Sequence, residues 1–507
     1  MSSKQIPYRK VNTLSPLVQD YLANKSALSS FCGRNNSLEN YRAQMLERSG
    51  FSTDRKMLVE VLKSQNSTLD LSEFTKNNIQ SLESPDTFTV TTGHQLCLFT
   101  GPLYFIYKIV STINLCQALK AHYTEKYFVP IFWMASEDHD FKEINHANAF
   151  GQTLSWESNQ SGAVGRMDLS DFSGVMQELE ALIGERDNAK ELLALFRKAY
   201  SSQNLALATR ILVNELFQED GLVIIDGDDV RLKTAFVEVM KKDIIRKEFL
   251  PILTSQSELM GRDYKVQAHV REINFFKLDK GSRKRISTEI SEAEITRHPE
   301  HFSPNVLMRP LYQEMLLPNL AYIGGGAEIA YWMQLKTAFE SEQVPFPILV
   351  LRNSAVLTSS SQLKKIEKMG LTVEDFFRNE ADLHKLYVQS QNNASLDEEI
   401  EALKKLFEGV KTKFAAQANM PVIDAEYQRQ KKSLEKLAKK LYRLEKLKHE
   451  TALSQISKIK ATFFPSGILQ ERYNSFIPYY LKYGDNFIKK LKEEFDPLDS
   501  NFVVLPL

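Results

Sequence analysis

The chain has 507 residues, which at roughly 150 residues per domain predicts about three domain-sized units. Its 43% hydrophobic and 10% aromatic residues suffice for a large core and exclude wholesale disorder. The 64 Lys and Arg residues balance 64 Asp and Glu residues, which argues against a protein whose main partner is nucleic acid.

The cysteines and apolar segments indicate the compartment. Cys32, Cys97 and Cys116 are widely spaced, so neither a disulfide framework nor a cysteine-built zinc site is expected. Strongly apolar stretches such as residues 128–135 fall far short of the ~18 residues that a membrane span needs. The N-terminus lacks the regions of a secretion signal. We therefore expect a cytoplasmic protein without a membrane partner.

Several short apolar strands alternate with helical patterns along the chain. Residues 1–84 are predicted to be largely helical. A β-branched and aromatic strand is expected over 87–92, followed by Gly93 and a helix through Leu119. Further buried strands are predicted at 127–135, 221–226, 320–323 and 346–351. This alternation predicts an α/β fold with an open, mostly parallel sheet, in a core over residues 85–390.

Two long stretches interrupt that core, and a different pattern follows it. Residues 151–215 and 250–310 are too long for simple crossovers and are interpreted as inserted subdomains. Residues 391–507 are assigned to a coiled coil and a C-terminal segment, because apolar residues there recur four and three apart. Asn419-Met420-Pro421 interrupts this pattern, and a second helix is expected to continue to about Lys460. Two such helices would form an antiparallel hairpin, and a homodimer is the simplest way to bury its remaining apolar seam.

Two basic segments raise the question of nucleic-acid binding. Residues 429–460 carry eleven Lys and Arg against three Glu. We favour pairing with the acidic first helix, which carries Asp397, Glu398, Glu399, Glu401 and Glu408, over nucleic acid. The basic loop 280–285 is interpreted as a solvated hairpin tip, although contact with phosphates is the alternative.

The first candidate site is Thr91-Thr92-Gly93-His94, at the end of a predicted strand and the start of a predicted helix. An α/β sheet binds ligands at such strand ends, and free helix N–H groups favour phosphate. Gly93 would let a phosphate approach the backbone, and His94 would donate a hydrogen bond to it. The spacing matches the [His/Thr]-x-Gly-His pattern of class I nucleotidyl transferases and aminoacyl-tRNA synthetases. An ordinary capping turn is the alternative.

The second candidate is Glu137-Asp138-His139-Asp140, which follows the strand at 127–135 and should lie at the same sheet edge. These groups suit an ammonium, sugar hydroxyls or Mg²⁺. If a helix begins nearby, His139, Glu143 and His146 would share one face and could ligate a thiol-binding Zn²⁺. Helix capping and supporting hydrogen bonds are the favoured interpretation over zinc.

The third candidate combines two further strand ends. Tyr322 precedes the triple glycine Gly324-Gly325-Gly326, where a nucleotide or substrate would approach bare N–H groups. Glu328 would orient a hydroxyl or amine there, whereas a tight strand-to-helix turn is an equally weighted alternative. Arg352 and Asn353 follow the strand at 346–351 and would add an anion clamp, or only a salt bridge.

Together these segments resemble the bacillithiol-synthesis cysteine ligases, the BshC family. The resemblance rests on Thr92-Gly93-His94-Gln95, Leu98-Phe99-Thr100-Gly101-Pro102-Leu103-Tyr104, Lys108, Phe132-Trp133, Glu137-Asp138-His139-Asp140-Phe141, Arg309-Pro310, Ala321-Tyr322-Ile323-Gly324-Gly325 and Leu469-Gln470-Glu471-Arg472. It covers residues 85 to the end most specifically. Such a family implies a Rossmann-like core with two connecting-peptide insertions and a coiled-coil dimerisation module.

The resemblance also implies a reaction, the joining of L-cysteine to glucosaminyl-malate in the last step of bacillithiol synthesis. A carboxylate does not acylate an amine in neutral water, so we expect ATP with Mg²⁺ to activate cysteine as cysteinyl-adenylate. An acyl phosphate with ADP release is the rival route. His94, Asp138 and His139 are the expected catalytic residues. No P-loop motif is present to hold ATP.

Two other functions remain open from the sequence. One is a class I nucleotidyl transferase or tRNA-charging enzyme with another acceptor, although zero net charge counts against tRNA. The other is a coiled-coil scaffold whose α/β body has lost catalysis.

Overall fold

The computed structural model describes residues 3–392, 396–414 and 420–507. These residues form two compact units. The larger unit comprises Lys4–Ala355 and Glu471–Val503, and the smaller unit comprises Val356–Gln470 and Val504–Leu507. The first boundary therefore lies at residue 355, whereas the sequence analysis places the end of the core near residue 390.

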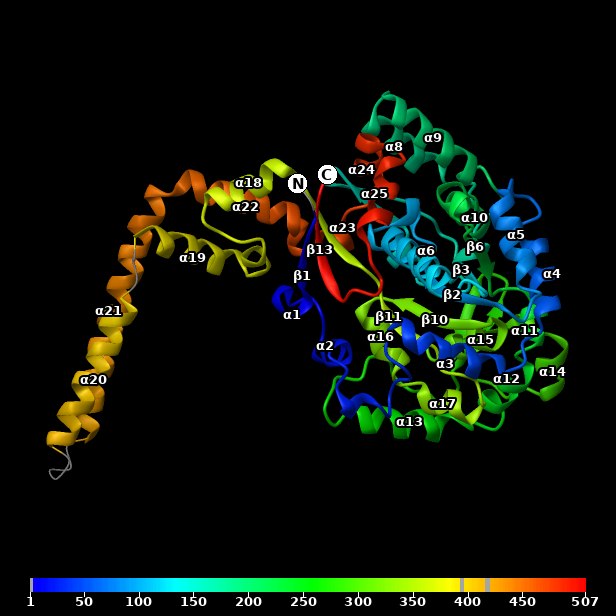
Figure 1. Cartoon of the computed structure of the whole chain (residues 1–507), viewed down its shortest axis with the longest axis horizontal. Coiled ribbons are helices and arrows are strands. Elements are labelled where there is room, and N and C mark those ends of the chain that lie inside the picture. The colour runs from blue at the N-terminus through cyan, green and yellow to red at the C-terminus, as the bar shows by residue number, and fades with distance from the viewer. Residues whose placement is uncertain (1–2, 393–395, 415–419) are drawn as a thin grey trace. The chain divides into compact units, whose positions relative to one another are not determined.

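A five-stranded sheet organises the larger unit (Figure 1). Neighbouring strands are parallel throughout, in the order β11 (Ile348–Leu351), β10 (Asn319–Gly324), β2 (Thr87–His94), β3 (Tyr127–Met134) and β6 (Val223–Asp226). Their carboxyl ends meet at one edge, where His94 is in register with Met134, and Met134 with Asp226. The predicted parallel sheet is confirmed, and each of the five predicted strands overlaps one of these.

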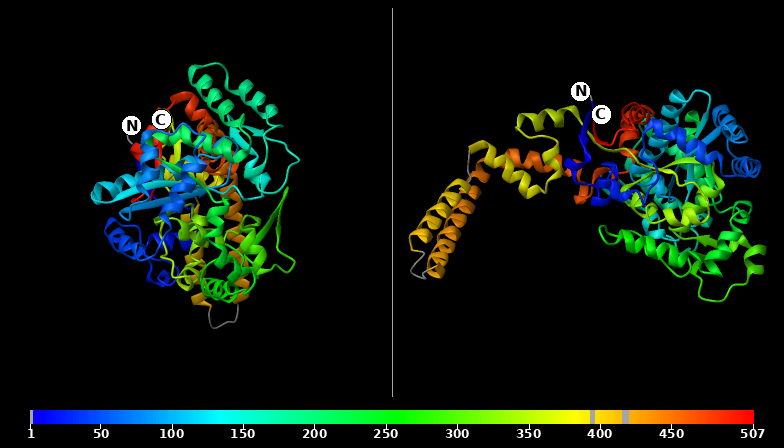
Figure 2. Two further views of the ribbon diagram at one scale, coloured as in Figure 1. Left: turned by 90° about the vertical axis from the view of Figure 1, so that its right-hand side faces the viewer. Right: turned by 60° about the horizontal axis from the view of Figure 1, so that its bottom comes forward.

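Helices cover both faces of this sheet, which is why its strands are apolar throughout. On one face Val90 belongs to a buried cluster with Leu115 of α6 (Tyr104–His122), beside α3 (Leu38–Ser49). On the other face Ile131 belongs to a second cluster with Leu62 of α4 (Arg55–Gln65), beside α15 (Met308–Leu316) and α16 (Gly326–Trp332). Figures 1 and 2 show α6 running along the sheet.

The helix that follows β2 begins ten residues later than the sequence analysis predicts. Strand β2 continues through His94, and α6 begins only at Tyr104. Between them Phe99, Thr100 and Gly101 adopt positive φ angles of 51°, 69° and 65°, which an α-helix cannot contain. The Phe99 amide donates a 2.7 Å hydrogen bond to the Tyr200 hydroxyl, which stabilises this loop. The prediction that the Thr91–His94 segment opens a helix is therefore wrong.

The remaining elements of the larger unit surround this core. The N-terminal segment is largely helical, as predicted, except for one short strand: β1 (Lys4–Pro7), α1 (Tyr8–Val11), α2 (Pro16–Leu22), η1 (Ser26–Leu28) and α5 (Glu73–Ser81). Elements near the sheet are η2 (Leu98–Thr100), α7 (Phe141–Ile144), β4 (His146–Ala149), η4 (Gln218–Asp220), α11 (Val230–Thr234), α12 (Val237–Ile244) and α17 (Lys336–Ser341).

Two segments are inserted between the strands. The segment after β3 carries β5 (Gln152–Ser155), η3 (Val164–Arg166), α8 (Ser173–Ile183), α9 (Asp187–Tyr200) and α10 (Leu205–Phe217). The segment after β6 carries α13 (Phe249–Met260), β7 (Phe275–Asp279), β8 (Ser282–Arg285), α14 (Glu292–Arg297), η5 (Pro299–His301) and β9 (Phe302–Pro304). Strands β8, β7 and β9 form an antiparallel sheet beside the main one.

The chain returns to the larger unit near its end. Strand β12 (Ser354–Thr358) is followed much later by α23 (Gln470–Tyr473), α24 (Ile477–Tyr483), α25 (Asn486–Glu494) and β13 (Asn501–Pro506). Asn114 of α6 donates a 2.6 Å hydrogen bond to the Phe495 carbonyl. This return fixes the segment that carries Glu471 and Arg472.

The smaller unit is helical. It contains α18 (Ser360–Lys368), η6 (Glu374–Phe377), α19 (Glu380–Asn392), α20 (Asp397–Lys413), α21 (Met420–Lys448), α22 (Glu450–Phe463) and η8 (Pro465–Gly467). Helices α20 and α21 lie side by side as an antiparallel pair (Figure 1), with the Phe407 and Tyr427 rings 5.6 Å apart and Lys411 ion-paired to Asp424. This pair confirms the predicted antiparallel helical hairpin.

The second helix of the pair is shorter than predicted. Helix α21 spans 29 residues, or about 44 Å, and ends at Lys448. His449 has φ −108° and ψ 16°, so the chain bends before α22 and no single helix continues to Lys460. Asn419 of the predicted turn lies outside the described residues, and Pro421 is the second residue of α21. None of the described helices combines the length and apolar composition that crossing a bilayer requires.

Candidate active site

A cleft of about 790 Å³ opens at the carboxyl edge of the main sheet. Gly93 and His94 at the end of β2, Glu137 and Asp138 after β3, and the glycines after β10 all line it. Arg352 after β11 lines it as well. The three sequence-predicted groups therefore converge on a single cavity, as the sheet-edge argument requires.

Some sequence-predicted residues support the cleft without lining it. Thr91 donates to Asn319 Oδ1 at 2.8 Å, and Thr92 donates to the Ile323 carbonyl at 2.8 Å, so both hydroxyls link β2 to β10. Asn353 is buried and donates to the Asp496 carbonyl at 2.8 Å. Gly324 and the exposed Asp140 are also absent from the cleft lining.

His94 is neutral at pH 7. Burial, together with the nearby Lys108 ammonium, lowers its pKa to about 4. Nδ1 lies 2.9 Å from the Gln95 carbonyl oxygen, which places the proton of the neutral ring on Nδ1. Nε2 then carries a lone pair and accepts hydrogen bonds. Donation from Nε2 to a phosphate, the predicted role, therefore requires a bound anion that raises the pKa.

A buried ion pair fixes the wall beneath His94. Lys108 Nζ lies 2.7 Å from Glu328 Oε2 and also donates to the Gly93 carbonyl. The Tyr322 hydroxyl and the Gly325 amide donate to the same carboxylate at 2.7 and 2.9 Å. Burial opposes ionisation of Glu328, yet Lys108 and these donors hold its pKa at about 2. Glu328 is therefore a fixed anion that joins β10 to α6.

Two arginines that line the cleft have buried donors without a partner among the described residues. Arg352 is ion-paired to Glu471 at 2.7 Å through Nη2, whereas its buried Nε has no hydrogen-bond partner among the described residues. Arg309 donates from Nη1 to Gln313 at 2.9 Å, and its buried Nη2 likewise has no partner in the described chain. A Cβ built on Gly93 would lie 3.3 Å from the Trp133 carbonyl oxygen, so the close approach of β3 favours glycine at this position.

Two residues of the basic hairpin over 280–285 line the cleft. Arg283 of β8 is only 8% exposed and lines the cleft together with Arg285. Its guanidinium donates to the Pro304 carbonyl at 2.9 Å and lies 3.5 Å from Asp138 Oδ1. The predicted solvated hairpin tip is therefore wrong for Arg283, because the β7–β9 sheet turns this side chain inward.

The acidic group after β3 is mostly occupied by protein partners. Lys233 Nζ lies 2.6 Å from Glu137 and 3.0 Å from Asp228. Asp138 accepts a 2.7 Å hydrogen bond from Gln95. His139 is 46% exposed, lies against Arg283 and does not line the cleft.

The predicted zinc ligands are not gathered. Helix α7 extends only over Phe141–Ile144, so His139 precedes it and His146 begins β4. The three side chains therefore do not share a helical face, and among the described residues only His298, Glu300 and His301 bring three metal-type ligand atoms within 4.8 Å of one another. The zinc alternative at His139, Glu143 and His146, over which helix capping is favoured, is wrong in its premise of a shared helical face.

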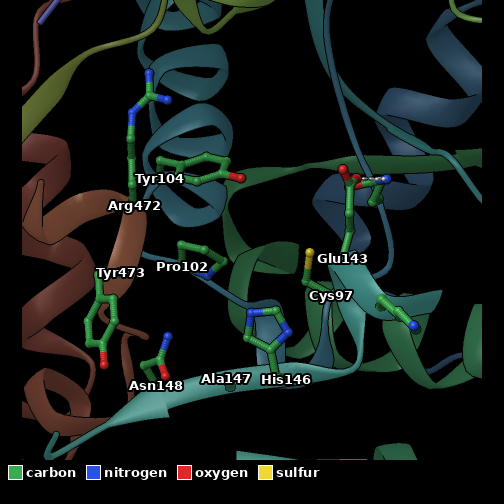
Figure 3. A pocket seen from close by; sticks show the side chains of 11 residues that line it. Cys97, Pro102, Tyr104, Glu143, His146, Ala147, Asn148, Arg472 and Tyr473 are labelled. Carbon is green, nitrogen blue, oxygen red and sulfur yellow. Dashed lines mark hydrogen bonds between the residues drawn. The ribbon is translucent and has the colours of Figure 1, made fainter. Parts of the chain in front are cut away.

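A second cavity of about 430 Å³ adjoins the first (Figure 3). Gln95, Tyr104, Glu143 and Arg472 line both cavities. The others that line the second cavity are Cys97, Pro102, Lys142, His146, Ala147, Asn148 and Tyr473. Burial raises the pKa of Cys97 to about 12, so its thiol is protonated at pH 7 and is no nucleophile.

Sequence reasoning did not assign several residues of these cavities. Tyr104, Lys108, Arg309 and Arg472 contribute to the family resemblance, but no local pattern indicates their roles. They lie on α6, α15 and α23, far apart in the chain, and only the folded arrangement brings them to the sheet edge.

Comparisons with known proteins agree with this architecture. Residues 1–353 match the profile "Bacillithiol biosynthesis BshC, N-terminal Rossmann-like domain", and residues 355–507 match the corresponding C-terminal coiled-coil domain. Relatives from Flavobacterium psychrophilum and Christiangramia forsetii are 41% and 40% identical, over 100% of this chain and 99% of each relative. A relative from Bacillus licheniformis is 27% identical over 96% of this chain and 97% of its own length. All three carry the name "Putative cysteine ligase BshC". With both domains matched along its whole length, the chain belongs to the BshC family of bacillithiol biosynthesis.

Proposed function

We propose that the protein is a ligase that joins L-cysteine to the amino group of glucosaminyl-malate, the last step of bacillithiol synthesis. The family and the names of its relatives support a cysteine ligase of this pathway. The malate-bearing acceptor is our inference from the resemblance, since its amine and carboxylates suit a cleft that contains both fixed acids and arginines.

The reaction needs an activated carboxyl group. Cysteine attacks the α-phosphate of ATP through its carboxylate oxygen, which forms cysteinyl-adenylate and releases pyrophosphate. The acceptor amine then attacks the carbonyl carbon, the bond to AMP breaks, and the amine loses a proton. The rival activation, through an acyl phosphate with ADP release, makes the same amide.

The observation that carries this proposal is the pair of unused buried donors in the cleft. Arg309 Nη2 and Arg352 Nε are both excluded from water and have no partner within the described residues. A buried N–H of an ionised group without a partner is costly, so the arrangement suits a ligand with anionic oxygens.

The protein groups around this anion site have defined tasks. Arg309 and Arg352 bind phosphate oxygens, and Gly93, Gly325 and Gly326 let them approach the backbone. His94 accepts a proton when the anion raises its pKa, and then donates from Nε2 to the charge that develops at the α-phosphate. Mg²⁺ is expected to bind together with the triphosphate and to neutralise part of its charge.

The smaller unit supports a homodimer. Leu437, Leu441 and Leu444 of α21 are 46%, 39% and 58% exposed, although they form an apolar series at helical spacing. A second copy of the chain is the simplest partner for this seam.

Thiol analysis of a strain that lacks the gene tests the proposed function. We expect bacillithiol to disappear and glucosaminyl-malate to accumulate, with both effects reversed by the intact gene. Unchanged bacillithiol would contradict the assignment.

A further inference from the structure

One carboxylate differs from the others that line the two cavities. Three of the four have a cationic partner within the protein: Glu137 with Lys233 at 2.6 Å, Asp138 with Arg283 at 3.5 Å, and Glu328 with Lys108 at 2.7 Å. Glu143 is the fourth, and it forms no ion pair with any described residue. Its charge is therefore available to a ligand.

A hydrogen bond fixes the position of Glu143. The Gln95 amide nitrogen donates one hydrogen to Asp138 Oδ2 at 2.7 Å and the other to Glu143 Oε2 at 2.8 Å. Gln95 thus links Asp138, in the acidic group after β3, to Glu143 of helix α7. Glu143 Oε1 has no hydrogen-bond partner among the described side chains, so it remains free to accept from a ligand.

The surroundings of Glu143 suit a small polar group. Figure 3 shows the Glu143 carboxylate, the Tyr104 hydroxyl and the Cys97 thiol around the same space, with His146 below them. Burial raises the pKa of Tyr104 well above its usual range and that of Cys97 to about 12. Both groups are therefore neutral at pH 7. Among the described residues that line the smaller cavity, Glu143 is the one acidic side chain, and Lys142 and Arg472 line it as well.

Glu143 lies where the two cavities adjoin, and this position limits where its ligand can bind. It lines both cavities, as do Gln95, Tyr104 and Arg472. The larger cavity carries the arginines that suit phosphate oxygens, among them Arg309 and Arg352. A cation held at Glu143 therefore lies at the passage between an anion-binding region and a smaller cavity.

We propose that Glu143 binds the primary ammonium group of an amine substrate, oriented by Gln95, at the junction of the two cavities. This inference rests on the proposed function, because both of its substrates, cysteine and the amino sugar, carry such a group. A carboxylate attracts an ammonium and accepts its hydrogen bond, whereas the cationic side chains elsewhere in the cleft repel it. Glu143 thus binds the amine, because the other carboxylates that line the larger cavity are already paired with cations of the protein.

Calorimetry on the full chain tests the proposal with two matched pairs of probes. Cysteine is compared with 3-mercaptopropionate, and glucosamine with glucose, because the second member of each pair lacks the ammonium group. The variants are Glu143→Gln and Glu143→Asp, and Glu157→Gln is the control for an exposed glutamate outside both cavities.

We expect the wild type to bind one ammonium-bearing probe more tightly than its partner, and Glu143→Gln to lose that preference by about tenfold. Glu143→Asp should restore part of it, and Glu157→Gln should leave it unchanged. If Glu143→Gln loses the preference for cysteine over 3-mercaptopropionate, the ammonium bound at Glu143 is that of cysteine. If it loses the preference for glucosamine over glucose, the ammonium is that of the acceptor.

A Glu143→Gln variant that keeps both preferences of the wild type would overturn the inference. Amide formation by the wild type is measured separately with cysteine, glucosaminyl-malate and ATP. If the amide forms while both preferences persist in Glu143→Gln, the inference fails and the proposed function stands. If no amide forms, the proposed function fails, whereas the loss of a binding preference would still place an ammonium at Glu143.

Discussion

Lys108 and Glu328 are separated by 220 residues in the chain, yet they form a buried ion pair of 2.7 Å beneath the cleft. The pair joins α6 to the turn after β10, and Lys108 also donates to the Gly93 carbonyl. The turn that carries His94 and the glycine turn that faces Arg352 are therefore fixed relative to each other by one side chain.

Replacement of Lys108 by methionine should destabilise the larger unit. The variant leaves the Glu328 carboxylate without its cation. Because Glu328 is 26% exposed, the cost should stay below the ~3 to 5 kcal/mol of a fully buried pair. The midpoint of urea unfolding, followed by tryptophan fluorescence, should fall. The double variant with Glu328→Gln should recover part of the loss, and the exposed Lys190→Met serves as control. A midpoint equal to that of wild type would contradict this prediction.

Acid should weaken the fold through His94. Its pKa is lowered from 6.5 to about 4 in the folded chain, so between these values the unfolded chain binds more protons. Stability therefore decreases as the pH falls from about 6.5 to 4. In His94→Gln, the loss between pH 7 and pH 5 should be smaller than in wild type by about 1 to 2 kcal/mol. Equal losses from urea titrations at the two pH values would show that His94 titrates normally.

Glu314 of α15 should make the folded protein less stable as the pH rises, which is the opposite of the effect of His94. Burial raises its pKa from 4.5 to about 7, so the folded chain holds this proton where the unfolded chain has lost it. Stability from this group therefore decreases as the pH rises from about 4.5 to 7. Glu314→Gln should lose less stability than wild type between pH 5 and pH 8, by about 2 kcal/mol. An identical dependence on pH in both proteins would refute the prediction.

Loss of the unused donor on Arg352 should weaken anion binding. Because removal of Arg352 alone leaves Glu471 buried without its cationic partner, the informative protein is the double variant Arg352→Gln with Glu471→Gln. Its affinity for inorganic pyrophosphate should fall about tenfold in calorimetry. The comparison proteins are Glu471→Gln alone and the exposed Arg262→Gln. If the double variant binds pyrophosphate as tightly as wild type, Arg352 does not bind the anion and this prediction is wrong.

Charges on α21 should reduce association of the smaller units. Leu441 and Leu444 are exposed, and their replacement by glutamate places two charges on the proposed seam. We expect sedimentation equilibrium to show a dimer for wild type and a monomer for the double variant, with pyrophosphate affinity unchanged. A wild-type monomer, or a variant that stays dimeric, would contradict the proposed interface.

The main sheet was predictable because its strands are continuous apolar runs and therefore carry a strong local signal. The location of the cleft followed from the rule that parallel strands present their carboxyl ends at one edge. By that rule His94, Glu137 and Gly325 are expected at one edge of the sheet, and all three line the cleft. The antiparallel helix pair was likewise predictable from apolar spacing, since Phe407 of the first apolar series contacts Tyr427 of the second helix.

The errors have local physical causes. Residues 95–103 include apolar side chains that favour a helix, but Gly101-Pro102 within them is a turn signal. The positive φ angles at Phe99 and Thr100 are further stabilised by tertiary contacts such as the Tyr200 hydroxyl. Arg283 reads as a surface residue within a basic loop, because only the fold of β7 to β9 turns it inward. The roles of Arg309 and Arg472 were not predictable, since each acts through neighbours far away in the chain.

Reconstitution with the purified chain tests the central claim most directly. The protein is incubated with cysteine, glucosaminyl-malate, ATP and Mg²⁺, and products are identified by mass spectrometry together with the adenine nucleotide released. We expect an amide of cysteine and glucosaminyl-malate that forms only with ATP, in equal amount to AMP. Amide formation without ATP, or no amide while the protein binds all three substrates, would contradict the central claim.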